Sequence, residues 1–120
     1  MDDYPVKLGP LLRARIDRDG NVVTLAFSGE LDLAAADPLG DWLDEIEATA
    51  PRAIVVDLAA LTFLDSSGAR ALLQAHDRAR GSRSFAVVSG DGPAHRALAL
   101  IGLDQVLAMV DSATDLRAPE

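Results

Sequence analysis

The clearest chemistry in this sequence lies in one short segment, Asp65-Ser66-Ser67-Gly68, which holds a carboxylate and two hydroxyls. The segment follows an apolar run and precedes residues with helical spacing, so a strand should lead into a helix here. The first N–H groups of a helix lack intrahelical acceptors, and the helix dipole favours negative charge there. The spacing predicts Ser66 as the N-cap, accepting from the N–H of Gly68 or Ala69. A phosphoryl group on that oxygen would meet the same donors, so the position suits a phosphorylation switch.

A second acidic segment, Gly29-Glu30-Leu31-Asp32, ends an earlier strand pattern. On spacing alone, Asp32 is interpreted as a turn acid beside a flexible glycine. For Ser66, the corresponding interpretation from the turn alone is an ordinary helix cap.

Taken together, the two segments resemble the STAS-domain anti-anti-sigma factors. In that family a turn like DSSG carries a phosphorylated serine, and the acid of a G-x-L-D segment lies near it at the partner surface. The resemblance covers about residues 11–116 and includes the ending IGLDQVLAMVDSATDL. The sequence departs from the family at Ala69-Arg70, where relatives often have a larger apolar residue, and in its short C-terminal helix.

The resemblance implies an anti-sigma factor antagonist that is not an enzyme. The unphosphorylated form would bind an anti-sigma factor, a serine kinase with a histidine-kinase-like ATP-binding fold, and so free a sigma factor. Phosphorylation of Ser66 would end binding, and a serine phosphatase would restore the residue. No cofactor, metal or catalytic residue is implied, and the free protein is expected to be a monomer or weak dimer. The implied partner-binding residues are Glu30, Asp32, Asp65, Ser66, Ser67, Gly68 and Arg70.

Composition agrees with one water-soluble domain. The chain has 120 residues, of which 49% are hydrophobic, and it has no cysteine, which excludes disulfides and thiolate metal sites. No apolar run approaches the roughly 20 residues of a membrane helix, and the N-terminus lacks a signal-peptide pattern, so a cytoplasmic protein is expected. The net charge of −8 argues against nucleic acid and anionic lipid as partners. It favours a protein partner with a basic surface.

The strands are predicted from alternating or β-branched apolar runs. Residues 11–16 and 22–28 should form an antiparallel hairpin around Asp19-Gly20, after a flexible lead-in over residues 1–10. Further strands are expected at 53–58, 85–89 and 105–110.

The helices are predicted from apolar stripes between turn residues. The first should begin at Asp37-Pro38, with proline in the first turn, and end before Pro51. The second follows the serine turn and ends near Gly81, and the third runs from Pro93 to Gly102. Asp111 or Ser112 could cap a last short helix. Apolar stripe positions are Leu39, Trp42, Leu43, Ile46 and Ala50, then Ala69, Leu72, Leu73, His76 and Ala79.

The element order predicts an α/β fold, and the resemblance implies a single STAS domain at 11–116, followed by a tail at 117–120. Its sheet should be mixed and mostly parallel, with an N-terminal β-hairpin and about four α-helices packed on it. Trp42 and His76 are expected in the core rather than in a binding site.

Three other functions remain open. A STAS module could dock on a transporter or signalling assembly without being phosphorylated. A hydrolase could combine Ser66 or Ser67 with His76 or His95, although the turn lacks the G-x-S-x-G elbow. A small-nucleotide sensor is the third.

Gly90-Asp91-Gly92 lacks the Lys and Ser/Thr of a P-loop and is predicted to be a turn.

Overall fold

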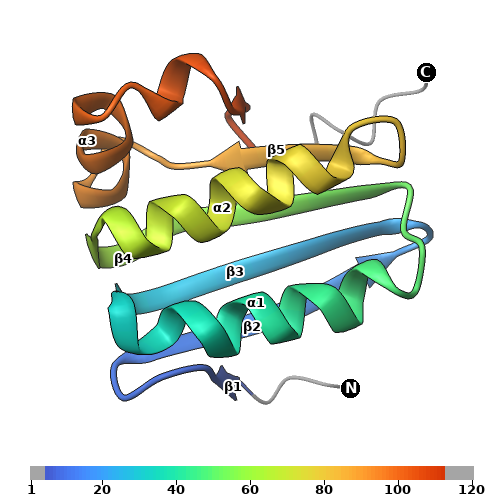
Figure 1. Cartoon of the computed structure of the whole chain (residues 1–120), viewed down its shortest axis with the longest axis horizontal. Coiled ribbons are helices and arrows are strands. Elements are labelled where there is room, and N and C mark those ends of the chain that lie inside the picture. The colour runs from blue at the N-terminus through green and yellow to red at the C-terminus, as the bar shows by residue number, and fades with distance from the viewer. Residues whose placement is uncertain (1–4, 113–120) are drawn as a thin grey trace.

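The computed structural model describes residues 5–112, and a mixed β-sheet organises this part of the chain (Figure 1). Within these residues the sheet has six strands in the order β1-β2-β3-β4-β5-β6. The strands are β1 (Val6–Lys7), β2 (Leu12–Asp19), β3 (Val22–Leu31), β4 (Ala53–Leu64), β5 (Ser84–Val88) and β6 (Ala108–Met109). The helices are α1 (Leu33–Glu47), α2 (Ser66–Ala79), α3 (Pro93–Leu100) and the 3-10 helix η1 (Leu103–Gln105).

Strand directions follow the prediction of a hairpin joined to a parallel sheet. Strands β2 and β3 are antiparallel and are joined across Gly20, whose positive φ of 62° suits a tight turn. The pairs β3–β4, β4–β5 and β5–β6 are parallel. The predicted mixed, mostly parallel α/β sheet is therefore confirmed. Three α-helices occur in residues 5–112 instead of about four, and the expected last helix lies outside the described residues.

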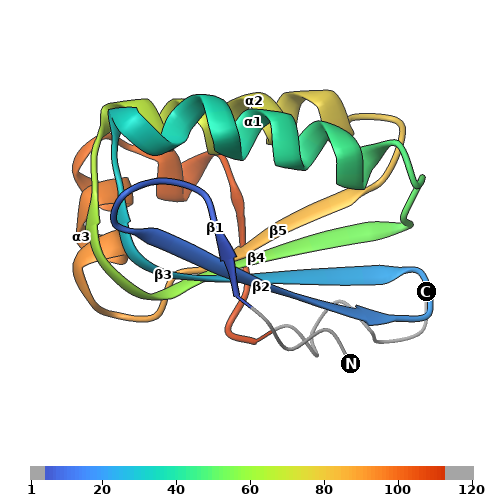
Figure 2. The ribbon, with the colours of Figure 1, turned by 90° about the horizontal axis from the view of Figure 1, so that it is seen from below.

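Helices α1 and α2 lie side by side over one face of the sheet (Figure 2). Their apolar stripes meet inward-facing strand residues in one continuous core that includes Leu25, Phe27, Leu43 and Leu72. Trp42 is half-buried at the margin of this core, with its ring edge-on to Phe27 at 6.1 Å between centroids. Helix α3 lies at the end of the sheet where β3 and β4 lead into α1 and α2 (Figure 1).

Helix α1 begins at Leu33, four residues before the predicted start at Asp37. Asp32 has extended backbone and is the N-cap, and the N–H of Ala35 donates to its carbonyl at 3.0 Å. Leucine and alanine are strong helix formers, so residues 33–36 extend the helix ahead of the proline. Pro38 consequently lies beyond the first turn, where its missing N–H costs one helical hydrogen bond.

Other boundaries also differ from prediction, since β3 and β4 extend to Leu31 and Leu64, beyond the predicted ends at 28 and 58. The lead-in expected over residues 1–10 contains strand β1, in which Val6 pairs with Ala14, and Leu8 is buried in the core. The strand expected over 105–110 is reduced to β6, because residues 103–105 form η1 after Gly102. Apolar content alone does not distinguish a short helical turn from a strand.

Candidate functional site

The two acidic segments singled out in the sequence meet where β3 and β4 end. These strands are parallel neighbours, and their last residues, Leu31 and Leu64, are paired in register. The residue after each strand is the N-cap of the following helix: Asp32 caps α1, and Asp65 caps α2. The N–H of Asp65 donates to the carbonyl of Leu31 at 3.2 Å. The fold thus joins two segments that lie 33 positions apart in the chain (Asp32 to Asp65).

Asp65, and not Ser66, caps α2. Its carboxylate Oδ1 accepts from the N–H of Gly68 at 3.0 Å, while its backbone is extended, at φ −104° and ψ −176°. Ser66 is already the first residue of the helix. The predicted cap was wrong by one residue, because aspartate and serine are about equally good caps and strand β4 runs up to Leu64.

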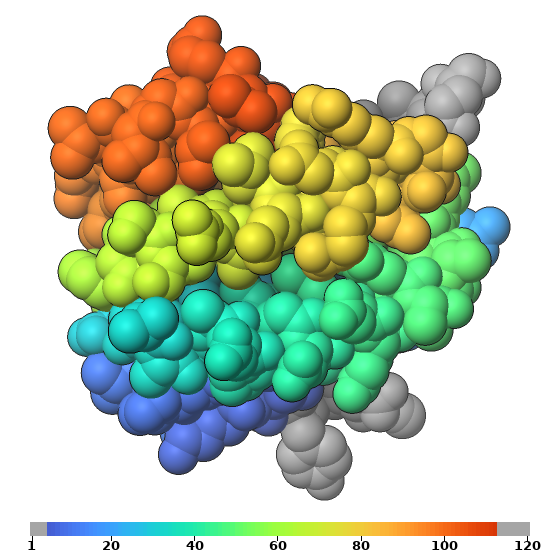
Figure 3. Space-filling view, viewed as in Figure 1, coloured from blue at the N-terminus to red at the C-terminus, as the bar shows by residue number. Residues whose placement is uncertain are grey.

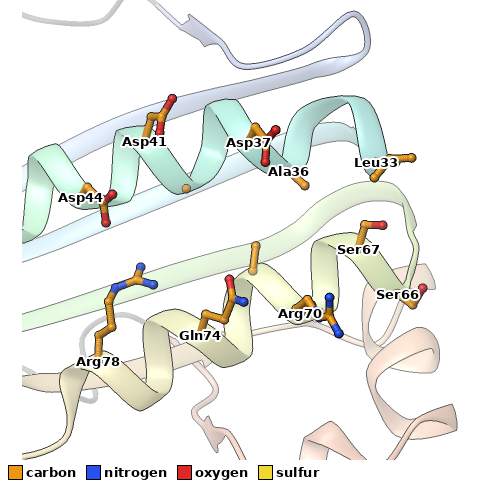
Figure 4. A pocket seen from close by; sticks show the side chains of 12 residues that line it. Leu33, Ala36, Asp37, Asp41, Asp44, Ser66, Ser67, Arg70, Gln74 and Arg78 are labelled. Atoms are coloured by element: carbon orange, nitrogen blue, oxygen red, sulfur yellow. The ribbon is translucent and has the colours of Figure 1, made fainter.

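The Ser66 side chain is left available by this arrangement. Ser66 is exposed, and its hydroxyl has no hydrogen-bond partner within the described part of the chain. Its neighbour Ser67 is half-buried and points toward α1 (Figure 4). Of the two serines, Ser66 is therefore the more exposed, and its hydroxyl is not the helix cap.

Gly68 is buried and has a packing role. A Cβ at this position would lie 2.6 Å from Cγ of Leu31 and 2.9 Å from Cδ1 of Leu64. Both distances are shorter than real carbon contacts, so only glycine lets α2 approach the end of β3 this closely. Of the predicted partner-binding residues, Gly68 is therefore the one that the fold covers.

Acidic and apolar side chains gather where β3 and β4 end and α1 begins. Asp32 is half-buried, and its carboxylate forms no capping bond to α1. Glu30 is half-buried on β3, opposite Phe63 of β4. Leu33 and Phe63 expose 73% and 46% of their surface. The sequence analysis did not select these two apolar residues for the site. The available signal was their position, since Leu33 directly follows Asp32 and Phe63 lies two residues before Asp65.

A groove of 690 Å³ separates α1 from α2 and opens beside the two serines (Figures 3 and 4). One wall is acidic and comes from α1, whereas the wall from α2 carries arginines and a glutamine. The lining residues are Leu33, Ala36, Asp37, Gly40, Asp41, Asp44, Ser66, Ser67, Arg70, Ala71, Gln74 and Arg78. The sequence predicted Asp37 as the start of this helix and did not indicate a groove wall formed by Asp37, Asp41 and Asp44.

The two arginines of the groove differ in their contacts. Arg78 donates from Nε and Nη2 to the two carboxylate oxygens of Glu47, at 2.8 and 2.9 Å. These hydrogen bonds, together with the charges of Glu47 and Asp44, raise the pKa of Arg78 despite its partial burial. Arg70, one turn after Ser66, is exposed and has no ion-pair or hydrogen-bond partner among residues 5–112.

The histidines lie away from the serine turn. His76 packs edge-on to Phe85, with 6.5 Å between ring centroids. His95 shares a 2.9 Å hydrogen bond through Nδ1 with Oγ of Ser89, a pair that the sequence did not indicate. Within the described residues neither histidine is hydrogen-bonded to Ser66 or Ser67, so the dyad imagined for a hydrolase is not formed.

Of the helices between residues 5 and 112, none combines the length and apolar character needed to cross a membrane.

Comparison with known proteins identifies the family. The model of the STAS domain matches residues 13–116. This chain belongs to the STAS domain family. Among curated STAS relatives, the anti-sigma-F factor antagonist RsfB of Mycobacterium tuberculosis is 33% identical over 99 residues, which cover 82% of this chain and 80% of RsfB.

Solved structures of other proteins agree with the fold. An anti-sigma factor antagonist from Mycobacterium paratuberculosis superposes with a TM-score of 0.79 and 27% identity, covering 87% of this chain and 89% of that one. The anti-sigma factor antagonist SpoIIAA in its unphosphorylated form has a TM-score of 0.73 and 18% identity, covering 89% and 98%. A sulfate transporter family protein from Wolinella succinogenes has a TM-score of 0.65 and 21% identity, covering 78% and 79%. The last two likenesses support the STAS fold alone.

Proposed function

We propose that this protein is an anti-sigma factor antagonist controlled by phosphorylation of Ser66. Its unphosphorylated form binds an anti-sigma factor, a serine kinase with a histidine-kinase-like ATP-binding fold, in the cytoplasm. Binding releases a sigma factor, phosphorylation of Ser66 ends the complex, and a serine phosphatase resets the protein. The similarity to RsfB, which is named as an anti-sigma-F factor antagonist, supports the class of partner.

One observation supports the switch: the Ser66 hydroxyl is exposed and forms no hydrogen bond with residues 5–112, beside a cap that Asp65 already supplies. Phosphorylation there removes no structural hydrogen bond, so the fold survives modification. The phosphate also lies at a helix N-terminus, where the dipole favours negative charge. The modified and unmodified proteins should therefore share one fold and differ at one point of the surface.

The charges and apolar side chains at this end of the sheet support the proposal that a phosphate ends binding. Leu33 and Phe63 offer apolar contact area, and Asp32 offers a carboxylate without a capping bond. A phosphoserine adds about −1.5 to −2 charges at this point. A partner packed closely enough to cover the apolar residues would then have to bury an incompletely paired dianion. A loss of a few kcal/mol is enough, since about 1.4 kcal/mol is tenfold in affinity.

The first experiment compares substitutions at Ser66 for binding to the anti-sigma factor. Ser66→Ala should bind constitutively, also after incubation with kinase and ATP, because no phosphate can be added. Ser66→Asp should bind at least about tenfold more weakly than Ser66→Ala, by the same charge argument. Titration calorimetry with the purified partner measures both values.

Ser67→Ala is the matched control at the neighbouring hydroxyl. It should remain a substrate and lose binding on phosphorylation, as the wild type does, when intact mass and phosphosite mapping are followed. Loss of all modification in Ser67→Ala would move the site to Ser67. Equal affinities of Ser66→Ala and Ser66→Asp would contradict the proposed switch.

A further inference from the structure

Resting on the proposed phosphorylation of Ser66, we propose that Arg70 holds the phosphate through an ion pair within α2. In the phosphorylated protein the Arg70 side chain then contacts the phosphate on residue 66. Phosphorylation therefore changes the position of a side chain as well as the surface charge.

Spacing places the two side chains next to each other. Ser66 and Arg70 are four residues apart on α2, and residues at this spacing are helix neighbours with about 5–6 Å between Cβ atoms. Both are exposed, and both line the mouth of the groove (Figure 4). An acidic group N-terminal to a cation at this spacing is the favourable orientation. The planar guanidinium of arginine can also donate two parallel hydrogen bonds to phosphate oxygens.

Arg70 is also the cation that is available. The other arginine of the groove, Arg78, lies two turns farther along α2 and is bound by both carboxylate oxygens of Glu47. Arg70 has no such partner among residues 5–112, so turning toward a phosphate breaks no existing contact. The cost of pairing is the side-chain entropy of one exposed arginine.

The surrounding charges make a compensating cation necessary. Asp65 lies directly before the modified residue, and Asp37 and Asp41 line the same groove from α1. A phosphate dianion would add to this negative charge, and at the serine end of the groove Arg70 is the lining residue of opposite sign. Repulsion from α1 and attraction to Arg70 both direct the phosphate along α2.

Pairing has a consequence for regulation. Arg70 is exposed beside Ser66 before modification and can contact an acidic group of a partner. After modification the same guanidinium is occupied by phosphate. Phosphorylation therefore changes two surface features together, and Arg70 should enlarge the difference in affinity between the two forms.

The test measures the second pKa of the phosphate by ³¹P NMR titration. Phosphoserine is incorporated at position 66 during translation, so no kinase is required. A nearby cation stabilises the dianion, and the pKa should therefore be lower by about 0.3 in the wild-type chain than in Arg70→Gln, the size expected of an exposed helical ion pair. Arg80→Gln is the control, because it removes the same charge about 15 Å farther along the helix axis. It should leave the phosphate pKa at the wild-type value.

A second measurement is independent of phosphoserine incorporation. A double-mutant cycle of Ser66→Glu with Arg70→Gln, followed by thermal unfolding, should show favourable coupling between residues 66 and 70. The same cycle with Arg80→Gln should show none. Equal phosphate pKa values in Arg70→Gln and Arg80→Gln, with no coupling in the first cycle, would overturn the proposal. Failure of a kinase to modify Ser66 would instead overturn the proposed function, because both measurements here are made without a kinase.

Discussion

At the scale of single residues, the cap of α2 and the proposed phosphorylation site are two different residues, Asp65 and Ser66. The Asp65 carboxylate accepts the N–H of Gly68, whereas the Ser66 hydroxyl is unbonded within the described residues. If Ser66 were the cap, attachment of a bulky phosphate would exchange one structural hydrogen bond for another. With Asp65 as the cap, helix α2 keeps its start in both states.

This division predicts unequal effects of two alanine substitutions on stability. Asp65→Ala should lower the free energy of unfolding by about 1 kcal/mol, because the N–H of Gly68 loses its acceptor. Ser66→Ala should change it by less than about 0.5 kcal/mol, as expected of an exposed side chain that forms no hydrogen bond with the described residues. Urea denaturation of the two variants and the wild type measures both changes. Equal losses would mean that Ser66 shares the capping role.

The sequence predicted which residues meet at the site but not their separate roles. Asp32, Asp65 and Ser66 were selected, and the structure brings their segments together. The cap was assigned to the wrong residue, because serine and aspartate have similar cap preferences and the choice depends on where β4 ends. The exposure of Leu33 and Phe63 depends on helix and strand boundaries, which local patterns fix only to within a few residues.

At the scale of elements, two glycines inside helices face opposite surroundings. A Cβ on Gly40 of α1 would have no neighbouring atom within 4 Å, whereas one on Gly68 would meet Leu31 and Leu64. Gly40→Ala should therefore raise the free energy of unfolding by up to about 1 kcal/mol through helix propensity. Gly68→Ala gains the same propensity, but overpacking of about 1–3 kcal/mol should exceed it and give a net loss.

Thermal unfolding of the two variants, Gly40→Ala and Gly68→Ala, tests whether their changes in the free energy of unfolding have opposite signs. Stabilisation by Gly68→Ala would show that α2 can move away from β3 at low cost. Such a result would contradict the close-packed junction described here.

Element types were more predictable than element boundaries. Alternation along residues 11–16 and 22–28 indicated the hairpin, and β-branched runs indicated the parallel strands. The start of α1 was placed too late because proline is common in a first turn, and Pro38 was interpreted in that way. The groove between α1 and α2 requires the packing of two helices, which no single helical pattern contains.

At the scale of the whole molecule, the net charge of −8 should guide association with a basic partner. The association rate constant for the anti-sigma factor should fall about tenfold between ~0.05 and ~0.5 M salt, because screening shortens the range of attraction. Stopped-flow mixing at several salt concentrations measures the slope of the association rate constant against salt concentration. Asp32→Asn should reduce that slope, whereas Glu45→Gln, an exposed residue nearer the far end of α1, should change it less. A rate independent of salt would exclude electrostatic guidance.

The hydrogen bond from Asp65 to Leu31 also has a consequence for protein turnover. The two acidic segments lie side by side only while the ends of β3 and β4 stay paired. A partner that contacts both segments therefore binds only molecules in which these strand ends are paired. By mass action, a free partner concentration of 100 times the dissociation constant stabilises the molecules with paired strand ends by about 2.7 kcal/mol. Antagonist molecules in a complex would therefore resist proteolysis, whereas phosphorylated ones would not receive this protection. The abundance of the partner would then help to set the lifetime of its own antagonist in the cell.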